Sequence, residues 1–271
     1  MSILKAASAV LAFALVLGAA NPLNAATDEY ANVHTVGVIS ILGNDLDMQT
    51  WGYTIFGNED YQLHTDWNLD DQVDSEVANA LKGRFAVKTI SIDPQTASHF
   101  MAKAHGTDWS AVEKLVRTLP ASDGVDAYVV VFPIVRMLGF GQRFWGGLVG
   151  RHVPDLRGPH IEFGAYYAVG VIEAGTGKRI DWGTGHLTTH GLLLDNAPDE
   201  QCAADMWATG ADAITPEQKS RIHQEMSSVI SRSIPYTLAG ANLLGEADAK
   251  AYAAQIALPG DPSCHEPQTA L

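Results

Sequence analysis

A glycine-rich segment, residues 137–154, combines residue types that bind anions with residue types that bind apolar surfaces. It reads MLGFGQRFWGGLVGRHVP and has five glycines between Gly139 and Gly150. Arginine pairs with anionic groups, and large aromatic side chains are costly to leave in water. We expect either a contact surface for a partner protein, an anionic glycan or a membrane, or a loop whose aromatic residues fold back on the core. The candidate contact residues are Arg136, Phe140, Arg143, Phe144, Trp145 and Arg151.

The glycine spacing does not fit a nucleotide-binding loop. A P-loop needs GxxxxGK followed by Ser or Thr, and the nearest text, Gly175–Arg179, lacks the first glycine and the hydroxyl residue. Gly139 and Gly141 begin a dinucleotide fingerprint, but its third glycine is missing. No cofactor is expected.

Two histidines, His186 and His190, have the HxxxH spacing of some zinc sites. A zinc protease also needs a glutamate after the first histidine, and that position is Leu187. The glycines and threonines around the pair favour a strand or loop, in which the histidines would lie about 13 Å apart, too far to share one ion. No GxSxG motif is present. A periplasmic hydrolase with a site of histidines and arginines is therefore only an alternative.

Residues 1–26 have the layout of a secretory signal peptide. Lys5 precedes an apolar run from Ala6 to Ala20, a helix break follows at Asn21-Pro22, and small residues stand at Ala25-Ala26. No cysteine lies near the cleavage point for lipid attachment, and no other stretch is long and apolar enough for a transmembrane helix. We expect a periplasmic or secreted protein.

Charge and cysteine content narrow the function further. The net charge of −14 argues against a nucleic-acid partner, because phosphate contacts need clustered Lys and Arg. The two cysteines, Cys202 and Cys264, are predicted to form a disulfide, with two buried thiols as the alternative. The disulfide would attach the C-terminal tail, residues 259–271, to the segment before the last long helix.

Hydrophobic patterning predicts one α/β (α+β) domain over residues 27–258. Six segments have the pattern of strands: 33–42, 48–56, 85–92, 127–135, 162–173 and 178–182. Four have the spacing or the caps of helices: 70–83, 107–119, 215–235 and 246–258. The first two strands are expected to form a hairpin, a long Gly-rich loop to cover 136–162, and Pro235 to end or kink its helix. We therefore expect a mixed sheet of about six strands with helices packed on it and further C-terminal helices.

The acids near the first helix have a structural explanation. Asp70 or Asp71 can cap the free amides of its first turn, and Asp74 suits the positive end of the helix dipole. A calcium site would need the EF-hand order of ligands, which is absent.

The order of these segments resembles an exported bacterial α/β module. VGVISIL precedes the helix VDSEVANALKGRF, AVKTISI follows directly, DAYVVVFPIV stands before a loop, and the hairpin AVGVIEAGTGKRI precedes a long helix. The module is shared by the TolB amino-terminal domain, penicillin-binding-protein activator lipoproteins and the curli-secretion lipoprotein family. Those families are often lipidated, and this chain has no cysteine for it. The resemblance implies a non-enzymatic binding or cell-envelope assembly module, with an envelope protein or glycan as its partner.

Overall fold

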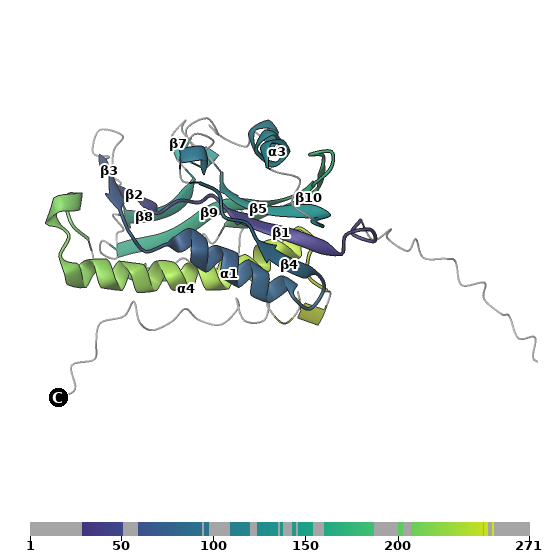
Figure 1. Ribbon diagram of the computed structural model, residues 1–271. Helices are drawn as coiled ribbons and strands as arrows, with labels where there is room; N and C mark the ends of the chain where they lie inside the picture. The colour runs from purple at the N-terminus through teal and green to yellow at the C-terminus, as the bar shows by residue number, and fades with distance from the viewer. Residues whose placement is uncertain are drawn as a thin grey trace, which may run out of the picture.

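The computed structural model confirms a mixed α/β fold, in which one sheet of nine strands carries helices on both faces (Figure 1). The residues it describes are 29–50, 59–93, 95–97, 109–119, 124–134, 136–137, 143–144, 146–153, 160–186, 200–202, 207–245, 247–248 and 251. The strands of this sheet are β1 (Thr35–Ser40), β2 (Asp45–Thr50), β3 (Glu59–His64), β4 (Ala86–Thr89), β5 (Ala127–Pro133), β8 (Gly147–Val153), β9 (His160–Glu173), β10 (Arg179–His186) and β11 (Glu200–Cys202). The helices are α1 (Leu69–Leu81), α3 (Trp109–Thr118) and α4 (Pro216–Gly240), and a 3-10 turn, η4 (Ala211–Ala213), precedes α4.

The long strand β9 organises the sheet. β5 pairs with its residues 167–173 and β8 with its residues 160–166, both antiparallel. They lie on the same side of β9, because β10 occupies the other side from 166 to 172. β1 runs parallel beside β5, and β2 runs parallel beside β8. The sheet therefore contains two long rows, β1–β2 and β5–β8, each made of two strands that point the same way.

The predicted hairpin between 33–42 and 48–56 is wrong. β1 pairs with β4 and β5, whereas β2 pairs with β3 and β8. The turn signal at Gly43 is real, since its φ is 79°, but the chain makes a sideways step there and then continues in the same direction. Turn residues specify local backbone geometry, and only the neighbouring rows determine whether the chain reverses.

Helices α1 and α4 cover one face of the sheet (Figure 1). The predicted stripe of Val73, Val77 and Leu81 is fully buried in the core beneath them. The two helices also bond to each other, because Ser231 donates its hydroxyl to Glu76 at 2.7 Å. The stripe was predictable since three apolar residues at a spacing of four must share one side of a helix.

The start of α4 confirms the predicted capping box. Thr215 Oγ1 accepts the N–H of Gln218, and Gln218 Oε1 accepts the N–H of Thr215. Pro235 was expected to end or kink this helix, but α4 continues through it to Gly240. A proline inside a helix costs about 3 kcal/mol. Burial of the surrounding turn, including Ile234 and Leu238, offsets that cost.

The opposite face of the sheet is covered by α3, which docks through its first residue, Trp109. The indole lies edge-on to Phe132 at 4.9 Å between ring centroids. A β carbon on Gly170 would come within 2.7 Å of this indole, so the glycine makes the space for it. Arg179 lies 4.6 Å from the centroid of the same ring, and Trp182, 46% exposed, contacts its edge. None of the helices described combines the length and the apolar content needed to cross a membrane.

Candidate functional site

The row formed by β5 and β8 contains an excursion of the chain. β5 ends opposite Tyr167, and β8 begins with Gly147 opposite Tyr166, the adjacent residue of β9. Ile134 donates its N–H to the Tyr166 carbonyl at 3.2 Å and so occupies the same level. Residues 135–146, which we call the excursion, therefore leave and rejoin what is otherwise one continuous row.

The excursion contains a short hairpin of its own. Its strands are β6 (Arg136–Met137) and β7 (Arg143–Phe144), and Arg136 pairs with Phe144 while Met137 pairs with Arg143. Figure 1 shows β7 on the face of the sheet that α3 covers, opposite α1 and α4. Three of the six predicted contact residues thus belong to a hairpin that stands off the sheet.

The excursion is closed by two glycines, Gly146 and Gly147, which we call its neck. A β carbon on Gly146 would lie 1.5 Å from the carbonyl oxygen of Ile134, where no atom fits. Gly147 has a φ of 107°, a conformation that residues with a side chain rarely adopt. The two chain segments can meet here because Gly146 has no side chain, and Gly147 supplies a backbone conformation that favours glycine.

The neighbouring row steps aside next to this neck. Residues 41–44 join β1 to β2, and Ile41 donates its N–H to the Val131 carbonyl at 2.9 Å. A β carbon on Gly147 would lie 3.9 Å from the carbonyl oxygen of Leu42. Both rows are therefore interrupted side by side. We call residues 41–44 together with the neck the seam.

The carboxylate of Asp70 holds the seam. Its Oδ1 accepts the Ser40 hydroxyl at 2.5 Å and the Leu42 N–H at 2.8 Å, and its Oδ2 accepts the Gly43 N–H at 3.1 Å. The sequence predicted that Asp70 or Asp71 caps the first turn of this helix. The carboxylate of Asp70 instead accepts the backbone amides that are left unpaired where β1 ends. A carboxylate that caps a helix accepts free backbone amides in the same way, but here the amides belong to another element.

The first turn of α1 is capped from the seam in return. Asn68, at the N-cap position, has a φ of 53° and makes no side-chain cap. The Leu69 N–H is instead accepted by Asn44 Oδ1 at 2.8 Å, and Thr65 donates its hydroxyl to the Asn44 carbonyl at 2.5 Å. The seam and the helix start therefore stabilise each other.

One helical turn after Asp70, the side chain of Asp74 is buried beside the end of β1. It is only 8% exposed, and its Oδ1 has no hydrogen-bond partner in the structure. Burial, together with the charges of Asp70 and Asp71, raises the pKa of Asp74 to about 7, whereas the hydrogen bond from the Ser40 backbone opposes the shift. A carboxyl group of this kind changes its charge near neutral pH.

Arg151 does not belong to the contact surface predicted for it. It lies in β8, is buried, and places its guanidinium 5.6 Å from the ring centroid of Tyr166. Across the ladder to β2, Gln49 donates its amide to Asp47 at 2.8 Å, and burial raises the pKa of Asp47. These groups form a polar patch in the sheet beside the seam.

The prediction of one long loop over 136–162 also needs correction, because part of this range is a strand of the sheet. The range contains all of β8, whose Leu148 and Val149 lie in the cores on opposite faces of the sheet. The glycines of the segment hid this strand, because Gly150 occupies a core position where Met48 and Phe163 fill the space of a side chain. Phe140 and Trp145 lie outside the described residues.

Several other predictions involve at least one residue that the structure does not describe. His186 ends β10 with its backbone opposite Tyr166, while His190 lies outside the described chain. Cys202 ends β11, but Cys264 is not described, so the disulfide stays a prediction, as do the signal peptide and the C-terminal tail. Within the described part of the chain, no group of three or more His, Cys, Asp or Glu side chains could hold a metal ion.

The sequence did contain a signal for Asp74. Counted from Asp70, Asp74, Val77 and Leu81 fall at intervals of four, seven and eleven, which places all four on one side of a helix. Two carboxylates thus belong to the apolar stripe, although their position near the helix dipole offered a simpler explanation.

Comparisons with known proteins do not assign a family. No family model and no curated protein matches the chain. Among solved structures, protein XCC0632 from Xanthomonas campestris, of the family DUF330, is 7% identical with a TM-score of 0.34, covering 78% of this chain and 86% of that one. The hypothetical protein CT253 from Chlamydia trachomatis is 12% identical with a TM-score of 0.22, covering 74% and 98%. At these scores neither likeness bears on function.

Proposed function

We propose that the protein is an exported, non-enzymatic binding module of the cell envelope that contacts its partner through the excursion. The observation that supports this is the continuity of the β5–β8 row across Tyr167 and Tyr166, which does not need residues 135–146. Such an insertion adds the entropy cost of closing a loop and requires the two neck glycines. Long loops on a rigid sheet are typical of binding elements.

The composition of the excursion indicates an anionic partner with an apolar layer beneath it. In a chain of net charge −14, it brings together Arg136 and Arg143 with three aromatic residues, Phe140, Phe144 and Trp145. Guanidinium groups pair with phosphate, phenylalanine side chains favour an apolar phase, and the amphipathic indole of tryptophan favours its boundary with water. We therefore propose that the partner is a membrane surface with anionic lipid headgroups.

The test is vesicle flotation of the full-length chain, expressed with its own leader and purified after export. Vesicles containing anionic phospholipid are compared with neutral ones. The decisive variant deletes residues 135–147 and joins Ile134 to Leu148. This join keeps the alternation of the row, because Ile134 and Val149 face one core while Leu148 faces the other. A cut at 139–150 would instead remove core residues of β8.

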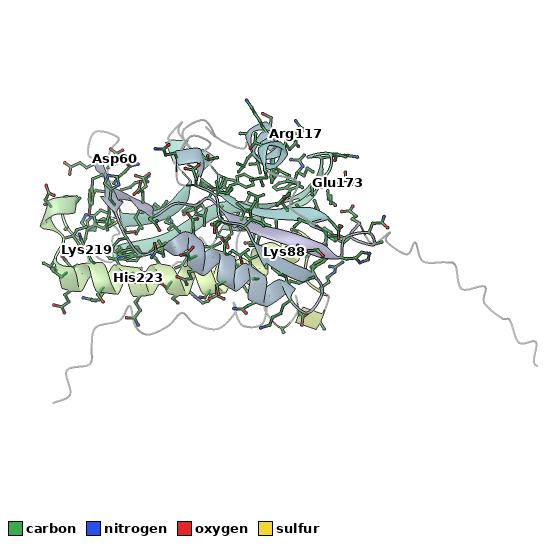
Figure 2. All side chains as sticks on the ribbon, in the orientation of Figure 1. Asp60, Lys88, Arg117, Glu173, Lys219 and His223 are labelled. Carbon is green, nitrogen blue, oxygen red and sulfur yellow. The ribbon has the colours of Figure 1, made fainter. Side chains whose placement is uncertain are left out.

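We expect the wild type to float with anionic vesicles and the deletion variant to stay behind. Arg136→Ala with Arg143→Ala should weaken binding by about tenfold or more, because each arginine near an anionic surface contributes about 1 kcal/mol. The matched control is Arg117→Ala with Lys219→Ala, which removes the same charge from α3 and α4, on the two sides of the sheet (Figure 2).

Two results would contradict this proposal. Flotation by the folded deletion variant would show that the excursion is not the contact. If the wild type ignores vesicles but captures a glycan or a protein from envelope extract, and the deletion variant does not, the excursion binds a different partner.

A further inference from the structure

The buried carboxyl of Asp74 is linked by a chain of contacts to the neck of the excursion, so a change in its charge affects that neck. Asp74 bonds the Ser40 backbone, Ser40 bonds Asp70, and Asp70 bonds the Leu42 and Gly43 amides of the seam. The Leu42 carbonyl lies next to the neck of the excursion. A continuous chain of contacts therefore runs from one buried acid to the element that we propose binds the partner.

The surroundings of Asp74 do little to stabilise a negative charge on its carboxyl group. Its Oδ1 is buried and makes no hydrogen bond, and the charges that act on it, Asp70 and Asp71, are both negative. From the other elements packed on α1, β1 presents the Ser40 amide, and α4 carries the hydroxyl of Ser231, the buried side chain of Glu225 and the partly buried side chain of Arg232. A buried anion with so little compensation is stabilised when water enters or when a proton neutralises it.

We propose that Asp74 is a proton-operated latch on the seam. With Asp74 protonated, the end of β1, the first turn of α1 and the neck pack as the structure shows. When Asp74 loses its proton, repulsion from Asp70 and the demand for water loosen residues 40–44, and the neck loses its support. The latch regulates the surface to which the proposed function assigns binding. Its effect on the seam is independent of that proposed function, whereas its effect on partner binding rests on it.

The first test needs no ligand. Hydrogen exchange of the Ser40, Leu42 and Gly43 amides is measured on the full-length chain from about pH 6 to about pH 8, corrected for the intrinsic pH dependence of exchange. In the wild type we expect protection to fall by roughly tenfold or more over this range, since one pKa unit corresponds to a tenfold change. Asp74→Asn should keep its protection throughout. Asp71→Asn, the same change at an exposed carboxyl of the same turn, removes one of the charges that raise the pKa of Asp74, so it should keep the fall in protection and shift it to somewhat lower pH.

A direct titration covers the case in which Asp74→Asn does not fold. The carboxyl carbon of Asp74, followed by NMR in the wild type, should titrate together with the Leu42 and Gly43 amide signals. Seam protection that does not change with pH, or an Asp74 carboxyl that is fully ionised at about pH 6, would overturn the latch. The latch would also be overturned if millimolar calcium restored protection of the seam amides at about pH 8, because Asp70 and Asp74 would then bind a metal ion.

A second measurement separates the latch from the proposed function. Flotation is repeated at both pH values with the wild type and Asp74→Asn. If both bind but neither depends on pH, the latch does not control the excursion and the binding proposal stands. If the seam amides respond to pH and no form binds vesicles, the proposed partner is wrong while the latch at the seam stands.

Discussion

Gly146 lies so close to Ile134 that a β carbon on the glycine would come within 1.5 Å of the Ile134 carbonyl oxygen. The two residues are far enough apart in sequence to enclose a hairpin, yet their backbones touch. This contact explains why a glycine stands at position 146. Gly146 and Gly147 close the neck of the excursion and Gly150 makes room in a strand, and neither role involves phosphate binding.

Replacing Gly146 with alanine should destabilise the protein strongly. The added methyl group must displace the Ile134 backbone, and we expect the free energy of unfolding to fall by about 3 kcal/mol or more. Urea denaturation measures the change. The control is Gly175→Ala, in a turn where a β carbon meets nothing within 4 Å, and we expect a change of less than about 0.5 kcal/mol. Equal effects of both substitutions would contradict the neck geometry.

Deleting residues 135–147 should leave a folded protein. Joining Ile134 to Leu148 continues the row opposite Tyr166 and Ala165 of β9, and a shorter loop lowers the entropy cost of closure. We expect cooperative unfolding and unchanged amide chemical shifts in α3 and β4, away from the seam. A molten or aggregated product would mean that the excursion contributes to the core and that β5 and β8 do not form one row.

The excursion also shows how far the sequence alone could lead. Local signals were sufficient where contacts are local: the capping box at Thr215 and Gln218, the stripe on α1, and the hairpin of β9 and β10 with its turn after Glu173. The pairing of rows depends on partners distant in sequence. The turn at Gly43 is compatible with a hairpin or with a chain that continues in the same direction. Likewise, Gly150 is compatible with a loop or a strand, and only the neighbouring strands decide in each case.

The same limit applied to the candidate site. Arg136 and Arg143 were identified by composition, and both belong to the excursion. Arg151 also lies in the glycine-rich sequence, but its position in β8 places its side chain in the buried part of the sheet, against Tyr166. Asp74 was overlooked because an acid in the first turns of a helix is ordinarily solvated. Only the position of β1 shows that this one is buried.

Replacing Asp70 with alanine should loosen the seam without unfolding the sheet. The substitution leaves the Ser40 hydroxyl and the Leu42 and Gly43 amides without their acceptor. Hydrogen bonds to a charged group are worth about 1.5–3 kcal/mol, and we expect a loss of stability of about 2–4 kcal/mol with faster exchange of those amides. Asp71→Ala, an exposed acid of the same turn, is the control. If both variants exchange alike at Leu42, Asp70 does not hold the seam.

Asp74→Asn should change how stability depends on pH. Burial raises the pKa of Asp74 from 3.8 to about 7, so the folded protein binds this proton more tightly than the unfolded chain does. The resulting stabilisation is fully present below pH 3.8, declines as pH rises, and is lost above about pH 7. The asparagine variant has no such proton to lose. At about pH 8 it should be more stable than the wild type by on the order of 4 kcal/mol, since the two pKa values differ by about three and one pKa unit corresponds to about 1.4 kcal/mol.

Urea denaturation from about pH 5 to about pH 8 measures this difference. The two stability curves should converge toward the acid end and separate toward the alkaline end, because only the wild type has an anion at this site. Asp71→Asn should keep the pH dependence of the wild type, shifted to somewhat lower pH, because it removes a charge that raises the pKa of Asp74. Parallel curves for Asp74→Asn and the wild type would mean that Asp74 is charged in the folded protein throughout. Repulsion between Asp70 and Asp74 would then have to be relieved by a bound cation or by water at the seam.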